Sequence, residues 1–415
     1  MPFILRVAVM AALAVATPAA LAEPLTLEAA ISRTLGIAPE AAASTARLDA
    51  LRAARSQAGV RPNPSVEVLA ENFAGTGPYQ FVDSPEVTGT YAQTVERGGK
   101  REARVALAEG DVGVAEAEAI VERLDIAARA QRAYVDAAAA QAEIDIAGER
   151  LRLAEALARE VDRRVAAARD PVFAGTRAAT RVAEARVDAE LAERARAAAM
   201  LRLAALWGGA AEEFNIPAAD FFRLNRPLVR GADSARADLA VIEARVKRAD
   251  AAIALERARR VQDPTFRAGL RYLRPADDVA AVAGFSIPLA RFDTNRANVD
   301  RALAERRRAD ADLEVFRQAR RRDLQLVETR VAQAWEEADA IRKRVVPGAE
   351  RTLAQVREGY ARGGFSYLDV TEAQTTLAMA RARLIAATRA YHTAGVEHDR
   401  LTGRFIELVI QEEGR

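Results

Sequence analysis

The chain has 415 residues, no cysteine, and 61 lysine and arginine residues against 59 aspartate and glutamate residues. The lack of cysteine excludes disulfide bonds, thiolate metal sites and lipid attachment at a cysteine. Because the opposite charges are interleaved rather than grouped, they indicate solvated helix faces with ion pairs between neighbouring turns, and nucleic-acid binding is not expected.

Residues 1–22 have the pattern of a secretory signal peptide. Arg6 provides a positive start, residues 7–16 a short apolar segment, and Ala20-Leu21-Ala22 a small-x-small cleavage site. We therefore expect the mature chain to begin near Glu23 and to leave the cytoplasm. No later uncharged apolar run is long enough for a membrane-spanning helix, so the chain could cross a membrane only as a closed β-barrel.

Four short segments alternate between apolar and polar residues: 65–73, 86–95, 265–273 and 279–289. Their length suits tilted transmembrane strands, and their alternation suits strands with one face toward lipid. On this hypothesis Leu270 lies on the lipid face. A small soluble hairpin at a helix end would explain the alternation nearly as well, but neither hairpin has an obvious soluble sheet to join.

The rest of the chain predicts long helices that lead to two tight turns. One helix is expected from about residue 98 to 168, and another from about 295 to 345, ending near Pro347. The turn at 169–173 offers Asp170 as N-cap and Pro171 as the first helical residue. In the turn at 363–366, two glycines precede Ser366 and Asp369, which have the spacing of a capping box.

A seven-residue period runs through the helices that follow these turns. Such a period predicts left-handed supercoiling, and a stripe of alanine lets neighbouring helices approach closely. The stripes are Val370, Leu377, Leu384, Tyr391 and His398; Ala373, Ala380, Ala387, Ala394 and Leu401; and, in the first half, Ala178, Ala185, Ala192, Ala199 and Leu206.

The chain also repeats itself at a spacing of roughly 195 residues, which indicates a duplicated unit. The matched positions are Asn63-Pro64 and Asp263-Pro264, Arg97 and Arg291, and Leu206-Trp207-Gly208 and Leu401-Thr402-Gly403. We expect a first repeat at 23–207, a crossover packed on the helices at 208–231, a second repeat at 232–403 and a tail at 404–415.

Four motifs give the chain a resemblance to a known family: LTLEAAISRTLGIAPE, VRPNPSVEVLAENF, ERGGKREAR and GGFSYLDVTEAQTTLAMARARL. The chain resembles the outer membrane factor (TolC-like) family of bacterial tripartite efflux systems over about residues 25–405. The end of the first strand and the ERGGKR turn are most similar to the heavy-metal branch, of the cobalt–zinc–cadmium type.

The resemblance implies a mainly α fold with a small β part. Three copies would form a homotrimer whose four strands per protomer make a shared 12-stranded β-barrel in the outer membrane lipid, above a long α-helical coiled-coil barrel in the periplasm. It also implies a periplasmic membrane-fusion adaptor and an inner-membrane RND pump as partners. The function implied is that of an exit duct for heavy-metal cations, with drug efflux or type I secretion as the alternative.

The same resemblance assigns roles to the two tips, where the duct narrows and the adaptor docks. The adaptor-contact residues would be Asp170, Pro171, Gly363, Gly364, Phe365 and Ser366. Asp369 and Glu372 match positions that form an acidic selectivity ring in some members. Both also suit the first turns of a helix in any protein, as a cap and as a charge that stabilises the helix dipole.

No catalytic arrangement is visible, and we expect neither an enzyme nor a cofactor or bound metal. His392 and His398 are six residues apart and so do not share a helix face as a metal pair would. A periplasmic coiled-coil adaptor would also carry a signal peptide and a helical hairpin. However, an adaptor resembles one hairpin flanked by compact β-domains, and this chain has two hairpin units and no such domain.

Overall fold

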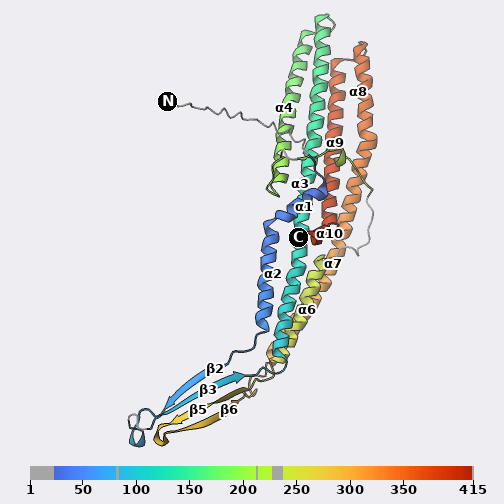
Figure 1. Cartoon of the computed structure of the whole chain (residues 1–415). Coiled ribbons are helices and arrows are strands. Elements are labelled where there is room, and N and C mark those ends of the chain that lie inside the picture. Colours follow the sequence, from blue (N-terminus) through green and yellow to red (C-terminus); the bar gives the residue numbers. More distant parts are fainter. Residues whose placement is uncertain (1–22, 81–83, 212–213, 227–236, 414–415) are drawn as a thin grey trace, which may run out of the picture. The chain divides into compact units, whose positions relative to one another are not determined.

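The computed structural model describes residues 23–80, 84–211, 214–226 and 237–413. The predicted signal peptide and residues 212–213 and 227–231 of the predicted crossover lie outside these ranges. Most described residues are helical, in long elements (Figure 1). The helices are α1 Leu27–Ile37, α2 Pro39–Ala58, α3 Lys100–Ala166, α4 Val172–Ala204, α5 Ala218–Phe221, α6 Ala237–Ala258, α7 Arg296–Ala340, α8 Val346–Ala361, α9 Tyr367–Thr402 and α10 Ile406–Glu413.

The chain divides into two compact units, which we describe one at a time. The tip unit comprises residues up to Thr34, Arg129–Arg226 and Ala334–Thr393. The sheet unit comprises Leu35–Ala128, Pro227–Gln333 and Ala394–Arg415. Each unit takes segments from both halves of the sequence. No helix among the described residues is both long and apolar enough to cross a membrane.

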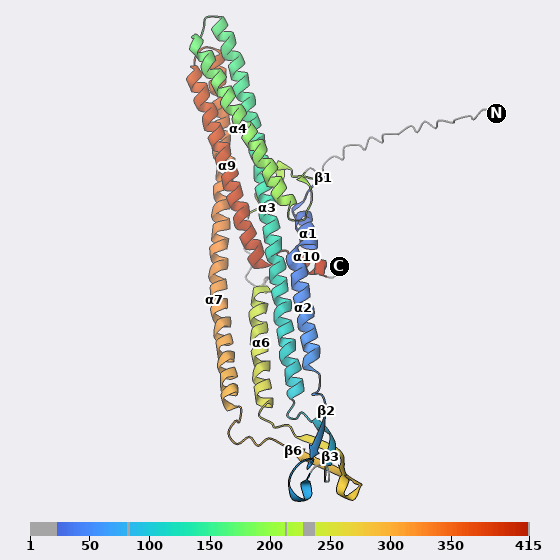
Figure 2. The ribbon, with the colours of Figure 1, turned by 90° about the vertical axis from the view of Figure 1, so that its left-hand side faces the viewer.

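The sheet unit contains one four-stranded antiparallel sheet with the order β2-β3-β5-β6 (Figures 1 and 2). Its strands are β2 Ser65–Glu71, β3 Glu86–Thr94, β5 Thr265–Leu273 and β6 Asp278–Ser286. The four strands occur where the alternation predicts them, with ends that differ by up to three residues. The two hairpins pair with each other through β3 and β5, from Glu86 opposite Leu273 to Thr94 opposite Thr265. Each hairpin therefore has the other hairpin as its partner in the sheet, and the sequence alone did not indicate this partner.

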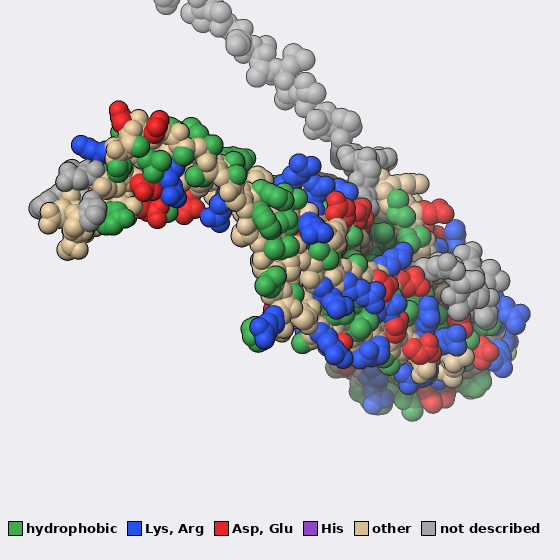
Figure 3. Space-filling model, turned by 90° about the horizontal axis from the view of Figure 1, so that it is seen from below, with side chains coloured by type: hydrophobic (Ala, Val, Ile, Leu, Met, Phe, Trp, Pro, Cys, Tyr) green, Lys and Arg blue, Asp and Glu red, His purple; other side chains and the backbone are tan. Residues whose placement is uncertain are grey.

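The register gives the sheet one apolar and one polar face. Leu270 lies between Gly89 and Ala281, and Phe266 opposes Phe285 with ring centroids 6.5 Å apart. Residues one position along point to the other face, where Arg271 donates hydrogen bonds to Thr88 (2.9 Å) and Glu86 (3.1 Å). Figure 3 shows hydrophobic side chains exposed over the sheet. The alternation of each strand thus becomes an amphipathic surface.

Side chains at the helix ends hold the sheet in place. Asp263 accepts hydrogen bonds from the Arg97 amide (2.8 Å) and the Lys100 ammonium (2.7 Å), so it joins the start of α3 to the strand that follows α6. Arg104 pairs with Glu96 and donates to the carbonyl of Ala58 (3.2 Å), which ties α3 to the end of α2. These charged contacts join α2, α3 and the segment between α6 and β5 beside the sheet.

The tip unit is built on small side chains, as the alanine stripe predicts. Ala178, Ala185 and Ala199 of α4 are buried, and so are Ala373, Ala380 and Ala387 of α9. The core that includes Ala199 also contains Trp207, Phe214 and Phe221. It includes the crossover segments β4 Phe214–Asn215 and α5, and β4 pairs in parallel with β1 Glu23–Pro24. The described part of the crossover is therefore packed on the helices, as predicted.

One helix boundary was predicted wrongly. The helix α7 does not end near Pro347 but continues through a π-helical turn, η4 Ile341–Val345, directly into α8. Proline lacks an amide hydrogen and its ring collides with the carbonyl four residues earlier, so it breaks a regular α-helix. A wider π-turn directly before Pro347 relieves this conflict, because the carbonyls there bond five residues ahead.

Two pairs of helix ends in the first and second halves of the chain have similar backbone conformations. Gly208 and Gly403 both take positive φ, 68° and 65°, just after α4 and α9. Gly99 and Asn295, with φ of 73° and 55°, stand directly before α3 and α7. Positive φ costs little for glycine and is tolerated by asparagine, so both halves use suitable residues at matching helix ends.

Candidate functional site

The first tip joins α3 to α4 and does not have the cap that the sequence suggested. Pro171, not Asp170, is the N-cap of α4, and it makes no side-chain capping bond. Ala168 takes positive φ, 57°, in the turn before it. The prediction of Asp170 as N-cap was wrong because its carboxylate is bound elsewhere.

Asp170 belongs to a clamp that joins the two tips. Its carboxylate accepts two hydrogen bonds from the guanidinium of Arg164, at 2.9 and 3.1 Å, and one from the hydroxyl of Tyr360, at 2.7 Å. Arg164 also donates to the Tyr360 carbonyl (2.9 Å), and its guanidinium carbon lies 4.4 Å from the centre of the Tyr360 ring. We call Arg164, Asp170 and Tyr360 the tip clamp. It connects the end of α3 to the end of α8.

The tip clamp is largely shielded from water, which strengthens its electrostatics. Tyr360 is buried, and the side chains of Arg164 and Asp170 are only 14% and 13% exposed. The hydrogen bonds from Arg164 lower the pKa of the Asp170 carboxyl. Burial and the bond to Asp170 raise the pKa of the Tyr360 hydroxyl. The ionised carboxylate and the neutral phenol are thus the stable forms.

The second tip, between α8 and α9, closes with a Schellman motif. Gly363 takes a φ of 82°, its amide donates to the Tyr360 carbonyl (3.0 Å), and the Gly364 amide donates to the Gly359 carbonyl (2.9 Å). Phe365 then folds back over α8, and its ring occupies the space that a Cβ on Gly359 would need. The two glycines therefore have the role in the turn that their sequence position predicts.

The capping box after the second tip is confirmed. The Ser366 amide and hydroxyl both donate to the Asp369 carboxylate at 2.7 Å, and the Asp369 amide donates to the Ser366 hydroxyl at 3.3 Å. These bonds from Ser366 lower the pKa of the Asp369 carboxyl. Asp369 and Glu372 are both exposed on the first turns of α9.

The tips also expose apolar side chains. Val172 and Phe173 at the first tip and Phe365 and Leu368 at the second are all exposed. Arg177 lies beside Phe173, with its guanidinium carbon 5.8 Å from the ring centre. Each of the two tips thus carries two exposed apolar side chains.

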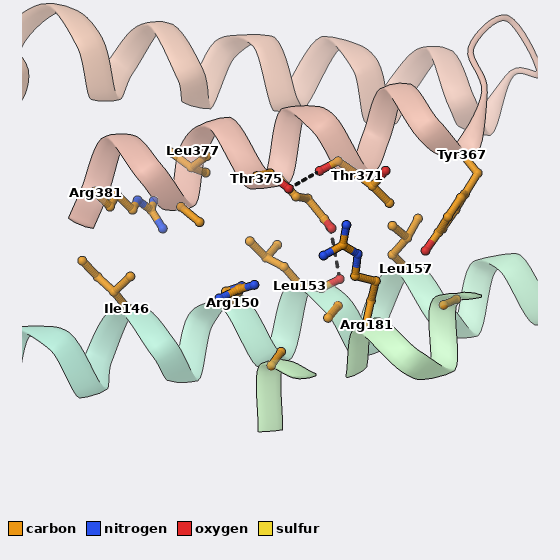
Figure 4. Close-up of a pocket in the computed structure, with 15 residues that line it drawn as sticks. Ile146, Arg150, Leu153, Leu157, Arg181, Tyr367, Thr371, Thr375, Leu377 and Arg381 are labelled. Carbon is orange, nitrogen blue, oxygen red and sulfur yellow. Dashed lines mark hydrogen bonds between the residues drawn. The ribbon is translucent and has the colours of Figure 1, made fainter. Parts of the chain in front are cut away.

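Behind the tips, a small cavity of about 50 Å³ lies between α3, α4 and α9 (Figure 4). The Tyr367 hydroxyl is buried there and has no hydrogen-bond partner among the described residues. The arginines around the cavity are engaged: Arg150 pairs with Asp188, Arg181 with Glu184, and Arg381 with Glu149 and Glu350. This volume has room for a few water molecules and is too small for a larger solute.

The histidines do not form a metal site. His392 packs against Phe221 and lies 2.8 Å from its carbonyl oxygen, and burial lowers its pKa. His398 lies 3.8 Å from the neighbouring Asp399. Within the described ranges, no group of three or more histidine, aspartate and glutamate side chains could hold a metal ion.

Comparisons with known proteins agree with this architecture. Residues 30–209 and 228–404 match the model of the family described as outer membrane efflux protein. The chain is 30% identical over 403 residues to the cobalt-zinc-cadmium resistance protein CzcC of Cupriavidus metallidurans, covering 93% of this chain and 92% of that one. It is 28% identical to the nickel-cobalt-cadmium resistance protein NccC of Alcaligenes xylosoxydans xylosoxydans, over 69% of this chain and 66% of that one.

Solved structures share the fold at low sequence identity. The outer membrane protein VceC of Vibrio cholerae superposes with a TM-score of 0.71 at 20% identity, covering 91% of this chain and 96% of that one. CusC, described as forming a transmembrane channel, superposes with a TM-score of 0.72 at 16% identity, covering 91% of each chain. With the family match over both halves, these comparisons show that the chain belongs to the outer membrane efflux protein family.

Proposed function

We propose that this protein is the outer membrane exit channel of a tripartite efflux system that exports heavy-metal cations. The observation that carries the proposal is the 30% identity to a cobalt-zinc-cadmium resistance protein along nearly the full length of both chains. The channel would work with a periplasmic membrane-fusion adaptor and an inner-membrane RND pump. Since no metal-holding cluster occurs among the described residues, the pump would select the metal and this chain would conduct it.

The four-stranded sheet supports assembly as a homotrimer. In the described chain β2 and β6 each pair on one side only, which leaves two open edges. An open edge in lipid leaves backbone groups without hydrogen bonds, at a cost of several kcal/mol each. Three copies joined edge to edge would close a 12-stranded barrel, with the apolar face around Leu270 toward lipid and the face of Arg271 toward the lumen.

The geometry of the tips supports their assignment as the adaptor-contact end. The six proposed contact residues are Asp170, Pro171, Gly363, Gly364, Phe365 and Ser366. Asp170 and the glycines have structural roles there, in the tip clamp and the Schellman turn, so we propose that they shape the surface. The exposed ring of Phe365, with neighbouring Val172 and Phe173, would supply its apolar contacts.

For the acidic selectivity ring we propose Glu372 as the stronger member. The Asp369 carboxylate already accepts two hydrogen bonds from Ser366. These bonds keep it ionised but hold it at the start of the helix. Glu372 is exposed, and no side chain of the described residues forms an ion pair with it within 4.0 Å. Three copies would bring six carboxylates together at the narrow end and attract cations through their combined field.

We also propose that the two sequence repeats, 23–207 and 232–403, are the evolutionary units of the chain. The signal peptide at 1–22, the crossover at 208–231 and the tail at 404–415 would lie outside them. Matching positive-φ residues at the helix ends support this division. The tail contains α10, whose Val409 carbonyl accepts a hydrogen bond from Arg123 of α3 (3.3 Å).

A growth assay tests the function. The gene would be expressed with its neighbouring pump and adaptor genes in a host that lacks its own metal exporters, and growth would be measured against cobalt, zinc and cadmium. Resistance that disappears when this chain alone is omitted is the expected result. Resistance to drugs, or secretion of a protein, without any metal resistance would contradict the metal substrate and favour drug efflux or type I secretion.

The acidic ring is tested separately in planar bilayers. Glu372→Gln keeps the side-chain size and removes the charge, so it should lower cation selectivity and blockade by multivalent cations without affecting assembly. Glu358→Gln is a matched control, because Glu358 is an exposed acid near the end of α8 that already pairs with Arg362. If both variants conduct like the unmodified channel, Glu372 is only a helix-start residue.

A further inference from the structure

All four connections between the sheet and the helices carry an exposed apolar side chain next to an exposed arginine. They join α2 to β2, β3 to α3, α6 to β5 and β6 to α7. Within each pair the arginine is an immediate neighbour or stands two residues away. The pairs are Val60 with Arg61, Val95 with Arg97, Val261 with Arg260, and Leu289 with Arg291.

These four arginines differ from most of those on the helices beside them. Arg104 pairs with Glu96, Arg248 with Asp111 and Arg306 with Asp250. By contrast, the side chains of Arg61, Arg97, Arg260 and Arg291 form no hydrogen bond or ion pair with any described residue. The connections thus present positive charge that the chain itself leaves unmatched.

The connection from β6 to α7 is the most exposed of the four. It spans residues 287–295, whereas its counterpart from β3 to α3 spans only 95–99. The additional residues include Phe292, which is 92% exposed, and Leu289 is 86% exposed. The guanidinium carbon of Arg291 lies 5.5 Å from the centre of the Phe292 ring. An aromatic ring and an arginine together suit a boundary between an apolar phase and water.

We propose that these four connections form a binding belt for phospholipid headgroups of the periplasmic leaflet of the outer membrane. The arginines would bind headgroup phosphates, and the apolar side chains would enter the acyl region beside them. The inference rests on the proposed function, which places the sheet in the membrane and the helices in the periplasm. Leu289 continues the odd-numbered apolar positions of β6, Val279 to Phe285, so the belt is continuous with the proposed lipid face.

Charge favours lipid over a second copy of the chain as the occupant. Two of the three acids in these connections form ion pairs within the chain: Glu96 binds Arg104 and Asp263 binds Lys100. The third, Asp293, accepts a hydrogen bond from the Asn295 amide (2.8 Å) and keeps its charge. The connections of a neighbouring copy would therefore bring one unpaired carboxylate to four arginines, which leaves most of the positive charge unmatched. The phosphate of a phospholipid supplies the missing negative charge.

Site-directed spin labelling tests where Phe292 lies, and the absence of cysteine makes it straightforward. Phe292→Cys would be labelled in the full-length trimer in liposomes of phosphatidylethanolamine and phosphatidylglycerol. The label should collide with oxygen and be protected from a water-soluble nickel chelate. Val315→Cys, an exposed aliphatic position on α7, is the control and should lack this lipid pattern. A label at 292 that is open to the chelate, or immobilised against another copy, overturns the proposal.

A second variant tests the arginines. Heat dissociation of the trimer in detergent would be followed with and without added phosphatidylglycerol. Replacing Arg61, Arg97, Arg260 and Arg291 with Gln should remove most of the stabilising shift, since each arginine near an anionic surface contributes about fivefold to affinity. Replacing Arg307, Arg321, Arg322 and Arg344, exposed on the helices, removes the same charge and should keep the shift.

The outcomes separate the two proposals. A trimer that inserts into liposomes but keeps the full lipid shift without the four arginines refutes the belt alone. A chain that never inserts as a trimer refutes the proposed function, and the belt with it.

Discussion

Replacing Tyr360 by Phe should loosen both tips by removing one hydrogen bond of the tip clamp. The Tyr360 hydroxyl donates to an ionised acceptor, the Asp170 carboxylate, at 2.7 Å in a buried setting. Hydrogen bonds to charged groups contribute about 1.5–3 kcal/mol. Because Asp170 keeps both bonds from Arg164, we expect the lower end, about 1.5 kcal/mol, which is about a tenfold increase in local opening.

Arg164→Ala should have a larger effect than Tyr360→Phe. It removes the bidentate pair, the bond to the Tyr360 carbonyl and the contact with the ring, and it leaves the Asp170 carboxylate with a single partner. Breaking a largely buried ion pair by removing one partner costs about 3–5 kcal/mol. Arg150→Ala is the matched control, because Arg150 also joins α3 to an aspartate that follows the first tip, Asp188, but both side chains are 44% exposed. An exposed pair contributes about 0–1 kcal/mol.

Hydrogen–deuterium exchange of the assembled protein, measured on peptides from both tips, distinguishes these variants. Exchange should rise at both tips for Tyr360→Phe and Arg164→Ala, although each replacement lies in only one hairpin. Arg150→Ala should leave both tips unchanged. Equal effects of Arg164→Ala and Arg150→Ala, or faster exchange confined to the substituted hairpin, would refute the idea that the clamp couples the tips.

Two further predictions concern pH and the sheet. Because the folded-state pKa of Asp170 is lowered, its stabilising effect is complete above the ordinary value of 3.8 and is lost as the pH falls through the lowered value. The protection of the tip amides, after correction for the intrinsic pH dependence of amide exchange, should therefore be constant from about pH 5 to 8 and fall only below about pH 4. Leu270→Arg on the apolar face should reduce the yield of membrane-inserted protein, at a cost of about 2–4 kcal/mol. Val282→Arg, on the opposite face of the adjacent strand, should insert normally, and equal yields would contradict the assignment of faces.

Features that depend on neighbouring residues could be predicted from the sequence. The capping box of Ser366 and Asp369 needs only residues three apart, and the alternation that defines β5 needs only its own side chains. The alanine stripes were likewise visible as a period, and burial of Ala178 and Ala373 confirms them. Each of these features depends on residues that are close together in the chain, so it can be recognised from the sequence alone.

Features that join distant residues could not be predicted. The hydroxyl of Tyr360 reaches Asp170 across 190 residues, and nothing near either residue indicates the other. Local reasoning assigned Asp170 as N-cap, but Arg164 offers its carboxylate two parallel bonds from a cation, whereas a helix amide offers a single bond. The pairing of β3 with β5 likewise joins segments that lie far apart in the sequence. The alternation of apolar and polar residues within each hairpin does not show whether the two hairpins pair with each other.

The π-turn before Pro347 leads to a last prediction, because such a turn is equivalent to one residue inserted into an α-helix. Deleting Arg344, which is exposed within the turn, should remove the insertion and leave Leu353 and Tyr360 of α8 facing the core. The deletion would be made together with Pro347→Ala, since proline in a regular helix costs about 3 kcal/mol. Deleting the exposed Gln355 in the same background is the control, because it turns the residues after it by about 100° and moves Tyr360 away from Asp170. Thermal stability and tip exchange should remain close to normal for the first deletion and be impaired for the second. If the two deletions are equally damaging, the π-turn does not act as a single-residue insertion.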